Sequence, residues 1–351
     1  MAHGGNEAGR ERIHAHFMGQ AVGCRQLGSP FTALFCELMA ERLDRSSAFG
    51  RRIFDWPGDP RADALSLRAA GACNALARSG RDPALRAAYP PNETQAEPLW
   101  QAVQAAIAGH DAFLTAYLDS APQTNEVRRC AVLLGGALTI ARECGLPLDL
   151  LEIGSSAGLN LGFERQRYEL GSAEWGGGAA PVTIRSQWRG ALPPLDAPLS
   201  VAARRACDLN PLDPSRREDR ERVLSYIWPD QAERLRTAEA AFDAAAAAPW
   251  RVERADAAAW VEARLVEEGP AGRARVLMHT IMWQYLPEAT KQRITAAMRQ
   301  AGAAATADRP LYWLRMEADG DSAAVTLGQW PGGAERELGR ADYHARWVEW
   351  H

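Results

Sequence analysis

LPLDLLEIGSSAGLNL, residues 146–161, is the stretch of the sequence that decides the fold. Its apolar run from Leu148 to Ile153 is typical of a strand buried on both faces of a parallel sheet. Gly154 and Gly158 bracket three residues with no side chain larger than a hydroxymethyl group, so a ligand can approach the backbone closely. The following AGLNLGFERQRY predicts a helix whose first N–H groups point toward the end of the strand. The stretch therefore predicts a strand, a turn and a helix around a small-molecule site.

Glu152 is the residue of this stretch that favours a ligand site. A carboxylate within an apolar strand is costly to bury unless a ligand hydroxyl or ammonium, or a neighbouring backbone N–H, hydrogen-bonds to it. Packing alone offers a second interpretation, because this order of elements recurs in α/β proteins and paired glycines let helix and strand pack closely. The acidic residue favours a site for a small, nucleoside-like molecule.

Composition limits the classes of partner. The chain has 351 residues, of which 47% are apolar, enough for a substantial core. Its 40 basic and 44 acidic side chains leave a net charge of -4, so no basic field attracts nucleic acid or an anionic membrane. The six cysteines form no C-x-x-C pair and follow no signal peptide, which predicts reduced, mostly buried thiols. No apolar run approaches the roughly 20 residues that span a bilayer. We therefore expect a soluble, cytoplasmic protein with a small-molecule substrate, and neither nucleic acid nor a membrane as partner.

Hydrophobic periodicity divides the chain into two regions. Residues 1–145 space apolar residues three and four apart throughout, which predicts an all-α N-terminal cap region. Residues 146–351 alternate short apolar runs with helical segments, which predicts a domain of β-α units. Glycine and proline punctuate residues 168–200, where we expect an inserted β-hairpin. The later predicted strands are residues 200–207, 251–255, 275–280 and 311–317, with antiparallel edge strands at 324–330 and 335–340.

Repeated β-α units imply right-handed crossovers and an α/β fold with a doubly wound, mostly parallel sheet. In such sheets ligands bind outside the carboxyl ends of the strands, where the strand order reverses. The residues expected at these ends are Glu152 to Gly158, then Asp208, Leu209 and Asn210, then Asp256 and Ala257, and finally His279 and Thr280. We expect the three carboxylates among them to converge on one hollow, with the small-residue turn as its floor.

The segment Glu152-Ile153-Gly154-Ser155-Ser156-Ala157-Gly158 resembles the first motif of the class I S-adenosylmethionine-dependent methyltransferases, acidic-x-Gly-x-Gly-x-Gly, with Ser156 in place of the middle glycine. The resemblance covers the part of the chain after the cap and implies a Rossmann-like sheet. It implies that the two glycines let the backbone approach the methionine part of the cofactor, that Asp208 accepts hydrogen bonds from the ribose, and that Asp256 with Ala257 lies beside the adenine. The implied cofactor residues are Glu152, Gly154, Ser155, Ser156, Gly158, Asp208, Leu209, Asn210, Asp256 and Ala257.

From the last helix of the cap to its end, the chain also resembles the bacterial domain-of-unknown-function family 2332. The phrases that carry this resemblance are TNEVRRCAVLL, LLEIGSSAGLNL, CDLNPLD, WPDQAERL, HTIMWQYLP and HARWVEW. The family name implies no activity. The chain departs from the methyltransferase pattern at Ser156, which adds a side chain where the cofactor passes closest. It departs again in the spacing from the glycine turn to the next acidic residue. This spacing is 50 residues from Gly158 to Asp208, whereas it is roughly 20 residues in a compact dinucleotide-binding unit.

His279 is the candidate catalytic base, because it ends the fourth predicted strand and imidazole titrates near neutral pH. The sulfonium already activates the methyl group, so the enzyme needs only to align an acceptor and remove a proton. A neutral histidine that hydrogen-bonds a strand end is the alternative. Trp283 and Tyr285 are candidate walls of a substrate pocket, with core or lid packing as their alternative. His14 and His16 lack a neighbouring cysteine or acidic cluster, so we expect no metal site.

Two functions of different classes follow. The first is a methyltransferase that uses S-adenosylmethionine and acts on a small molecule under the helical cap. The second is a non-catalytic module that binds a nucleoside-like ligand or a partner protein. A nicotinamide-dependent dehydrogenase fits less well, because the turn has G-x-x-x-G instead of G-x-G-x-x-G and a pyrophosphate would face Glu152. An exposed apolar face on the cap helices would favour a homodimer.

Overall fold

The chain forms two compact units, which are described in turn. The structure is a computed structural model that describes residues 2–267 and 269–351, with side chains from residue 9 onward. The first unit contains Met1–Thr124 and Glu218–Arg236, and the second contains Asn125–Arg217 and Thr237–His351. This division differs from the predicted one at residue 145 in two places. The last helix before residue 145 belongs to the second unit, and the segment 218–236 belongs to the first.

The regular secondary structure of the first unit is helical in the part that the structure describes. Its helices are α1 (Ala2–Gln26), α2 (Pro30–Arg42), α3 (Ala48–Phe54), α4 (Leu65–Ser79), α5 (Pro83–Ala87), α6 (Ala96–Tyr117), α8 (Arg217–Ser225) and the start of α9 (Ala232–Ala246). Ser29 caps α2 by accepting the N–H of Thr32, and Pro30 takes the first helical position, where a missing N–H costs nothing. α4 ends at Gly80, whose φ of 70° is the left-handed cap that glycine adopts without strain. The predicted all-α region is confirmed.

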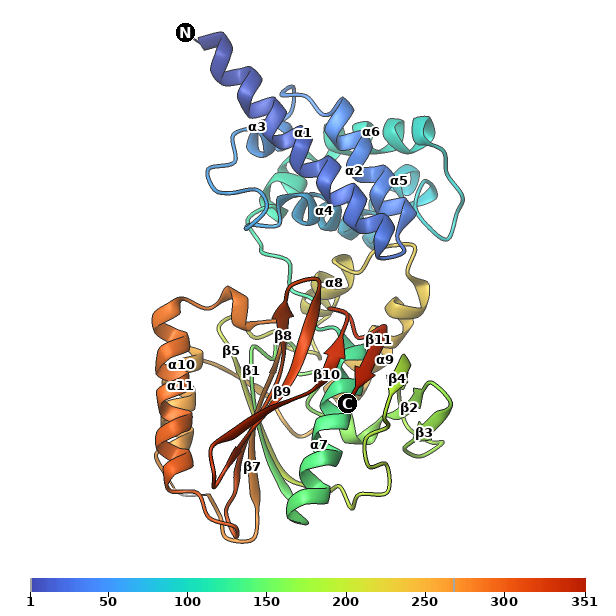
Figure 1. Cartoon of the computed structure of the whole chain (residues 1–351). Coiled ribbons are helices and arrows are strands. Elements are labelled where there is room, and N and C mark those ends of the chain that lie inside the picture. Colours follow the sequence, from blue (N-terminus) through green and yellow to red (C-terminus); the bar gives the residue numbers. More distant parts are fainter. Residues whose placement is uncertain (1, 268) are drawn as a thin grey trace. The chain divides into compact units, whose positions relative to one another are not determined.

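The second unit is built on an eleven-stranded sheet with the order β3-β2-β4-β11-β10-β9-β8-β7-β1-β5-β6 (Figure 1). The strands are β1 (Leu148–Ile153), β2 (Arg167–Leu170), β3 (Ala173–Trp175), β4 (Thr183–Gly190), β5 (Val201–Asp208), β6 (Val252–Arg254), β7 (Ala274–Thr280), β8 (Leu311–Asp319), β9 (Ser322–Trp330), β10 (Ala334–Ala341) and β11 (Trp347–Trp350). The helices are α7 (Cys130–Cys144), α10 (Ala257–Leu265) and α11 (Glu288–Ala303), with short 3-10 helices η1 (Val127–Arg129), η2 (Phe163–Arg165) and η3 (Trp283–Tyr285). Neighbouring strands from β8 through β6 are parallel, while β9 and β10 are antiparallel. A mixed α/β architecture with a mostly parallel, open sheet and N-terminal helices is therefore confirmed.

Helices cover both faces of the parallel strands (Figure 1). On the face of α10 and α11, Leu151 of β1 and Val261 of α10 belong to one apolar core. On the opposite face lies α7, where a Cβ at Gly136 would stand 2.4 Å from the side chain of Leu314. Only glycine lets helix and strand approach this closely. Because both faces are covered, β1 and β7 are buried at nearly every position, and for β1 this confirms the prediction of a strand buried on both faces.

The prediction of a helix directly after β1 is wrong. The residues there form turns and the 3-10 helix η2 before β2 begins. Gly154, Ser156 and Gly158 have φ values of 66°, 53° and 72°. Every second residue of this segment therefore lies in the left-handed region, which an α-helix cannot accommodate. The chain leaves β1 through an irregular turn, and no helix N-terminus stands over the end of the strand.

The predicted insertion at residues 168–200 extends the main sheet. β2 and β3 form the expected antiparallel hairpin. β4 then pairs in parallel with both β2 and β11. β11, a strand that the sequence did not predict, connects this group to β10. The insertion is thus a continuation of the sheet beyond its antiparallel strands.

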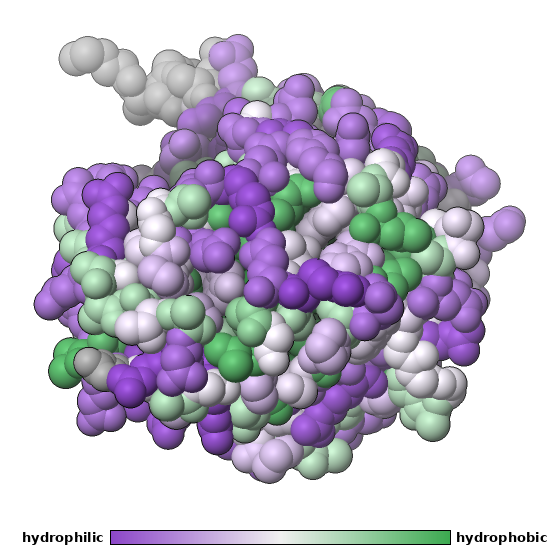
Figure 2. All heavy atoms as spheres, turned by 60° about the horizontal axis from the view of Figure 1, so that its bottom comes forward, coloured by the Kyte–Doolittle hydropathy of each residue, from purple (hydrophilic) through white to green (hydrophobic). Residues whose placement is uncertain are grey.

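Apolar and hydrophilic side chains are interspersed on the face of the molecule drawn in Figure 2, and its coloured part carries no broad apolar patch. Single exposed apolar side chains, such as Leu192 and Val266, are ordinary on a protein surface. No helix among the described residues has the length and apolar character needed to span a membrane. All six cysteines are free thiols and five of them are buried, as predicted.

Candidate functional site

The turn after β1 is fastened to the end of β5, the neighbouring parallel strand. Ser155 donates its backbone N–H to the carbonyl of Cys207 at 3.2 Å, and Ser156 donates its own to Asp208 Oδ2 at 2.8 Å. The other oxygen of Asp208 accepts the N–H of Asn210 at 2.8 Å. Asp208 therefore orders both its own loop and the turn after β1, and each oxygen keeps lone-pair capacity for a further donor.

Glu152 lies beneath this turn and is only 3% exposed. Its Oε2 accepts the hydroxyl of Ser155 at 2.7 Å. Burial raises the pKa of Glu152 to about 7, the Ser155 hydrogen bond opposes this shift, and the negative charge of Asp208 adds to it. Glu152 is thus a carboxyl group that exchanges a proton near neutral pH, a property often found at functional sites.

Ser156 carries the clearest sign of a missing partner. It is 6% exposed, and its hydroxyl makes no hydrogen bond to any residue that the structure describes. Its φ of 53° is also unusual for a residue other than glycine. A buried hydroxyl without a partner costs about 1–3 kcal/mol, which a ligand or a bound water could recover.

The two glycines of the turn face protein side chains. A Cβ at Gly154 would lie 2.8 Å from Cγ of Met282, and a Cβ at Gly158 would lie 2.9 Å from Cγ2 of Val252. Both positions therefore need glycine for close packing as well as for their positive φ. The approach to the Gly154 backbone that the sequence led us to expect is filled by Met282, a flexible thioether side chain.

Asp256 serves as a helix cap. Its Oδ1 accepts the N–H of Ala259 at 3.0 Å and lies 3.7 Å from Nη1 of Arg293, and its side chain is exposed. Ala257 opens α10 and packs at the edge of the apolar core. Of the three predicted carboxylates, the structure brings Glu152 and Asp208 together around the turn, whereas the contacts of Asp256 are with α10 and α11.

The loop after β5 exposes the other predicted residues of this group. Leu209 is an exposed apolar side chain, and its carbonyl accepts from Arg254. Asn210 Oδ1 accepts from the same guanidinium at 3.0 Å. Arg254 of β6 therefore fixes the loop that carries Asp208.

His279 is completely buried and bonded at both ring nitrogens. Its Nδ1 lies 2.6 Å from Glu317 Oε1, and its Nε2 accepts the indole N–H of Trp313 at 3.0 Å. These partners assign the proton of the neutral ring to Nδ1. Trp283 stacks on the imidazole with ring centroids 5.1 Å apart. The role of His279 as a base stays a prediction, and this arrangement favours its alternative, a histidine that holds a strand end in place.

Glu317 organises the turn that follows β7. Its Oε2 accepts the backbone N–H groups of Met282 and Trp283, both at 3.1 Å. Ile281, between β7 and this turn, has a φ of 48°, a strained value for a β-branched residue. The fixed turn places Met282 against Gly154, while Tyr285 projects into solvent. Sequence reasoning missed Ile281 and Met282, and no local pattern marks them, because their roles depend on β8.

The segment before α7 contributes a further buried polar layer. Asn125 Oδ1 accepts the N–H of Leu159 at 2.9 Å. Arg129, also buried, donates to the carbonyls of Tyr343 and Thr280. This segment therefore ties the turn after β1 to the end of β7.

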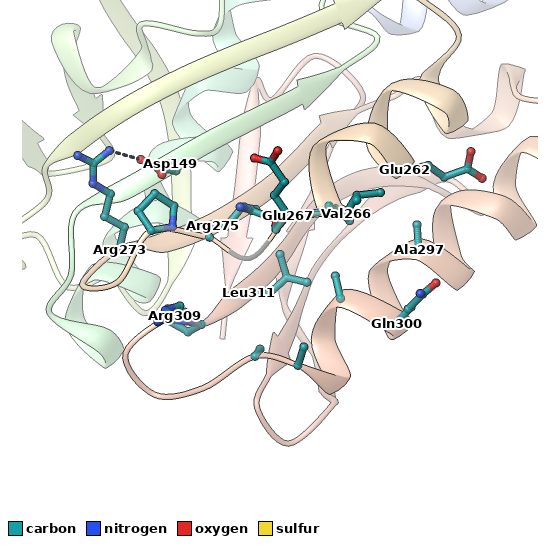
Figure 3. A pocket seen from close by; sticks show the side chains of 17 residues that line it. Asp149, Glu262, Val266, Glu267, Arg273, Arg275, Ala297, Gln300, Arg309 and Leu311 are labelled. Atoms are coloured by element: carbon teal, nitrogen blue, oxygen red, sulfur yellow. Dashed lines mark hydrogen bonds and ion pairs between the residues drawn. The ribbon is translucent and has the colours of Figure 1, made fainter.

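A cavity of about 310 Å³ lies at the opposite, amino ends of the parallel strands (Figure 3). Arg273 and Arg275 at the start of β7 line one side, and Arg273 pairs with Asp149 at 3.3 Å. The helices α10 and α11 supply the other side, through residues such as Glu262 and Ala297. None of the predicted site residues is among the described residues that line this cavity.

Fold and site together define a mixed α/β protein with a polar, acidic turn at the carboxyl ends of its central strands. Among the described residues, no group of three or more His, Cys, Asp or Glu side chains is placed to hold a metal ion. A family model described as "uncharacterized protein conserved in bacteria (DUF2332)" matches residues 14–350. The chain therefore belongs to this bacterial family. Neither the curated proteins nor the solved structures searched contained a match.

Proposed function

We propose that this protein binds S-adenosylmethionine at the carboxyl ends of β1 and β5 and transfers its methyl group to a small-molecule acceptor. One observation carries the proposal. The parallel strands run in the order β8-β7-β1-β5-β6, so the order in sequence reverses beside β1, the strand whose turn links Glu152 to Asp208. Such reversal points are where doubly wound, Rossmann-like sheets bind their ligands.

The chemistry of the turn suits this cofactor. Adenosylmethionine carries a sulfonium and an ammonium group, and two carboxyl groups flank the turn. Asp208, half-exposed and already oriented by two backbone N–H groups, can accept ribose hydroxyls. The unpaired hydroxyl of Ser156 can bond to the same ligand. A ligand that reaches the Gly154 backbone has to displace Met282, whose unbranched side chain adapts readily.

The protein's own part in the reaction is orientation and proton transfer. When bound, the cofactor supplies an activated methyl group. Glu152, whose pKa burial raises to about 7, is suited to accept the proton of a hydroxyl or amine acceptor. His279 and Glu317 act as positioning residues, because they hold the turn that carries Met282 and Trp283.

Calorimetric titration of the full chain with S-adenosylmethionine and S-adenosylhomocysteine tests the proposal. We expect binding of both, and an at least tenfold higher Kd for Asp208→Asn, because a charge-assisted hydrogen bond contributes about 1.5–3 kcal/mol. Asp196→Asn is the matched control, since Asp196 is an exposed carboxylate of the same unit. Absence of heat from the unmodified protein at millimolar ligand would overturn the proposal.

A non-catalytic binding module is the second candidate. It is favoured by the two occupied nitrogens of His279 and by the contact of Met282 with Gly154. This candidate predicts that adenosyl ligands bind while radiolabelled methyl groups are transferred to no component of a bacterial small-molecule extract. Transfer that is lost in Glu152→Gln and retained in Asp196→Asn would exclude it.

A further inference from the structure

We propose that the first unit contains a separate binding site for a small, hydroxylated anion. The site is a cavity of about 330 Å³ lined only by residues of this unit. α4 forms one wall, the loop Tyr89–Asn92 the second, and the segment 221–235 the third. The proposal is independent of the adenosylmethionine site, because all the residues that carry it belong to the other unit.

The cavity is a fixed feature of the unit, because buried hydrogen bonds hold its walls together. Asn74 of α4 donates its amide to the carbonyls of Ser225 and Ile227 at 2.9 and 3.1 Å. Tyr226, between these two residues, packs against Gly71, where a Cβ would lie 2.5 Å from the ring. Opposite them, Asn92 donates to the carbonyl of Tyr89 at 3.2 Å and so closes the proline loop. The two loops that border the cavity are therefore anchored to α4 or to themselves.

Two polar side chains on this lining have hydrogen-bonding capacity that the described residues leave unused. Tyr89 is 3% exposed, and its hydroxyl makes no hydrogen bond to any residue in the described part of the chain. Asn74 is 5% exposed, and its side-chain oxygen likewise receives no donor from the described residues. Neither oxygen is among the buried polar atoms that lack a partner, so each reaches the accessible surface and is available to a ligand that offers a donor or an acceptor. Hydroxyl groups of a ligand can do both.

The charge of the lining favours an anion. Its charged side chains are Arg78, Arg86 and Glu221, of which Arg78 and Glu221 pair at 3.1 Å. The guanidinium of Arg86 makes no ion pair or hydrogen bond to the residues that the structure describes, so its planar fork of donors remains available. Such a fork matches a carboxylate or phosphate group. Pro90, Pro91 and Leu235 supply apolar contacts for a short carbon skeleton.

These groups together specify the ligand's chemistry. One end carries a phosphate or carboxylate for Arg86, and the body carries hydroxyl groups for Asn74 and Tyr89. Small sugar phosphates and hydroxycarboxylates share this chemistry, and the cavity volume admits molecules of that size.

Calorimetric titration of the full chain with four ligands tests the site: glycerol 3-phosphate, malate, inorganic phosphate and uncharged glycerol. We expect glycerol 3-phosphate or malate to bind, inorganic phosphate to bind at least several-fold more weakly, and glycerol not to bind. Whichever of glycerol 3-phosphate and malate binds with the lower Kd identifies the anionic group as a phosphate or a carboxylate. Binding of neither at millimolar concentration overturns the proposal.

Three variants locate the binding. Arg86→Gln should raise the Kd at least about tenfold and Tyr89→Phe about three- to tenfold, consistent with the loss of one charged and one neutral hydrogen bond. Arg81→Gln is the control, because Arg81 is exposed, stacks on Phe113 at 4.3 Å and does not line the cavity. Circular dichroism verifies that each variant is folded. Unchanged affinity in folded Arg86→Gln, or an equal loss in Arg81→Gln, contradicts the assignment.

Discussion

Two carboxyl groups at neighbouring strand ends have different environments in this protein. Glu152 is buried and receives one hydroxyl donor, so its neutral form is favoured. Asp208 is partly exposed and receives two backbone N–H groups. The two side chains therefore differ in access: Asp208 can accept hydrogen bonds from a ligand, whereas Glu152 lies beneath the turn.

The ionisation of Glu152 should make stability depend on pH. Its pKa of about 7 in the folded protein lies above the ordinary value of 4.5, so the folded state binds the proton more tightly. This stabilisation is complete below about pH 4.5 and is lost as the pH rises through about 7. Urea unfolding should show a free energy of unfolding that falls by up to about 3 kcal/mol across this interval. Glu152→Gln should remove this component, and an undiminished slope in that variant contradicts it.

The contact between Gly154 and Met282 can be separated from the backbone requirement at Gly154. Gly154→Ala should destabilise the protein by about 1–2 kcal/mol through its positive φ, with a further loss from the clash with Met282. Met282→Gly introduced into the same chain should recover only the part due to the clash, because Cβ of Met282 also lies 2.9 Å from the new methyl group. Urea unfolding of the two single variants and the double variant measures both terms. Simple additivity would show that Met282 does not cover Gly154.

At the scale of elements, the turn after β7 depends on its neighbour β8. Trp313 and Glu317 both come from β8, and they bond the two nitrogens of His279. Glu317 also holds two N–H groups of the turn. The strand ends of β7 and β8 are therefore joined through side chains beyond their backbone ladder.

Trp313→Phe tests this connection. The substitution leaves the buried Nε2 of His279 without its donor, which should cost about 1–3 kcal/mol in the free energy of unfolding. Trp188→Phe is matched to it, because the indole N–H of Trp188 also donates one hydrogen bond, to Ala191, but at an exposed position. Its cost should be below about 1 kcal/mol. Equal losses of unfolding free energy in the two variants would mean that the hydrogen bond from Trp313 to His279 stabilises the protein no more than the exposed one of Trp188.

The start of α4 depends on a histidine from α1. Ala64, the residue before the helix, offers no side-chain cap, and His16 Nε2 instead accepts the N–H of Ser66 at 3.1 Å. Burial lowers the pKa of His16 below 6.5, so the unfolded chain takes up the proton first as the pH falls. Stability contributed by neutral His16 is therefore present above about pH 6.5 and decreases below it. His16→Ala should remove that dependence and cost about 0.5–2 kcal/mol at neutral pH, whereas exposed His14→Ala should do neither.

Elements with strong local patterns were predictable and long-range pairings were not. The short runs between helical segments gave β1, β5, β7 and β8 to within one or two residues. The prediction of a helix after β1 was wrong, because Ala157 to Tyr168 has helix-like composition but follows two left-handed residues, Gly154 and Ser156, and contains a third, Gly158. β11 was not predicted, because its four residues form a strand only by pairing with β10 and β4. For the same reason, the sequence predicted the acids of the turn but not Met282 or the bonds to His279.

At the scale of the whole molecule, the chain passes between the two units three times. The segment 218–236 returns to the first unit and fills its core, where Tyr226 and Trp228 are buried. Tyr117 of α6 lies 2.5 Å, hydroxyl to hydroxyl, from Ser225 of this segment. The segment therefore belongs to the helical unit energetically, although it lies between strands of the sheet in sequence.

This connectivity predicts that the chain cannot be divided at residue 145. A fragment of residues 146–351 lacks α7, whose Gly136 and Gly135 pack against Leu314 and Trp350, and it also exposes the apolar side chains of segment 218–236. We expect it to be insoluble, or to unfold without a cooperative transition in calorimetry.

In the full chain, Gly71→Val tests the contact between segment 218–236 and α4 without truncation. Its side chain would overlap the ring of Tyr226 and should lower the free energy of unfolding by about 1–3 kcal/mol. A fragment 146–351 that unfolds cooperatively, together with a Gly71→Val variant of unchanged stability, would show that segment 218–236 is not part of the first unit's core.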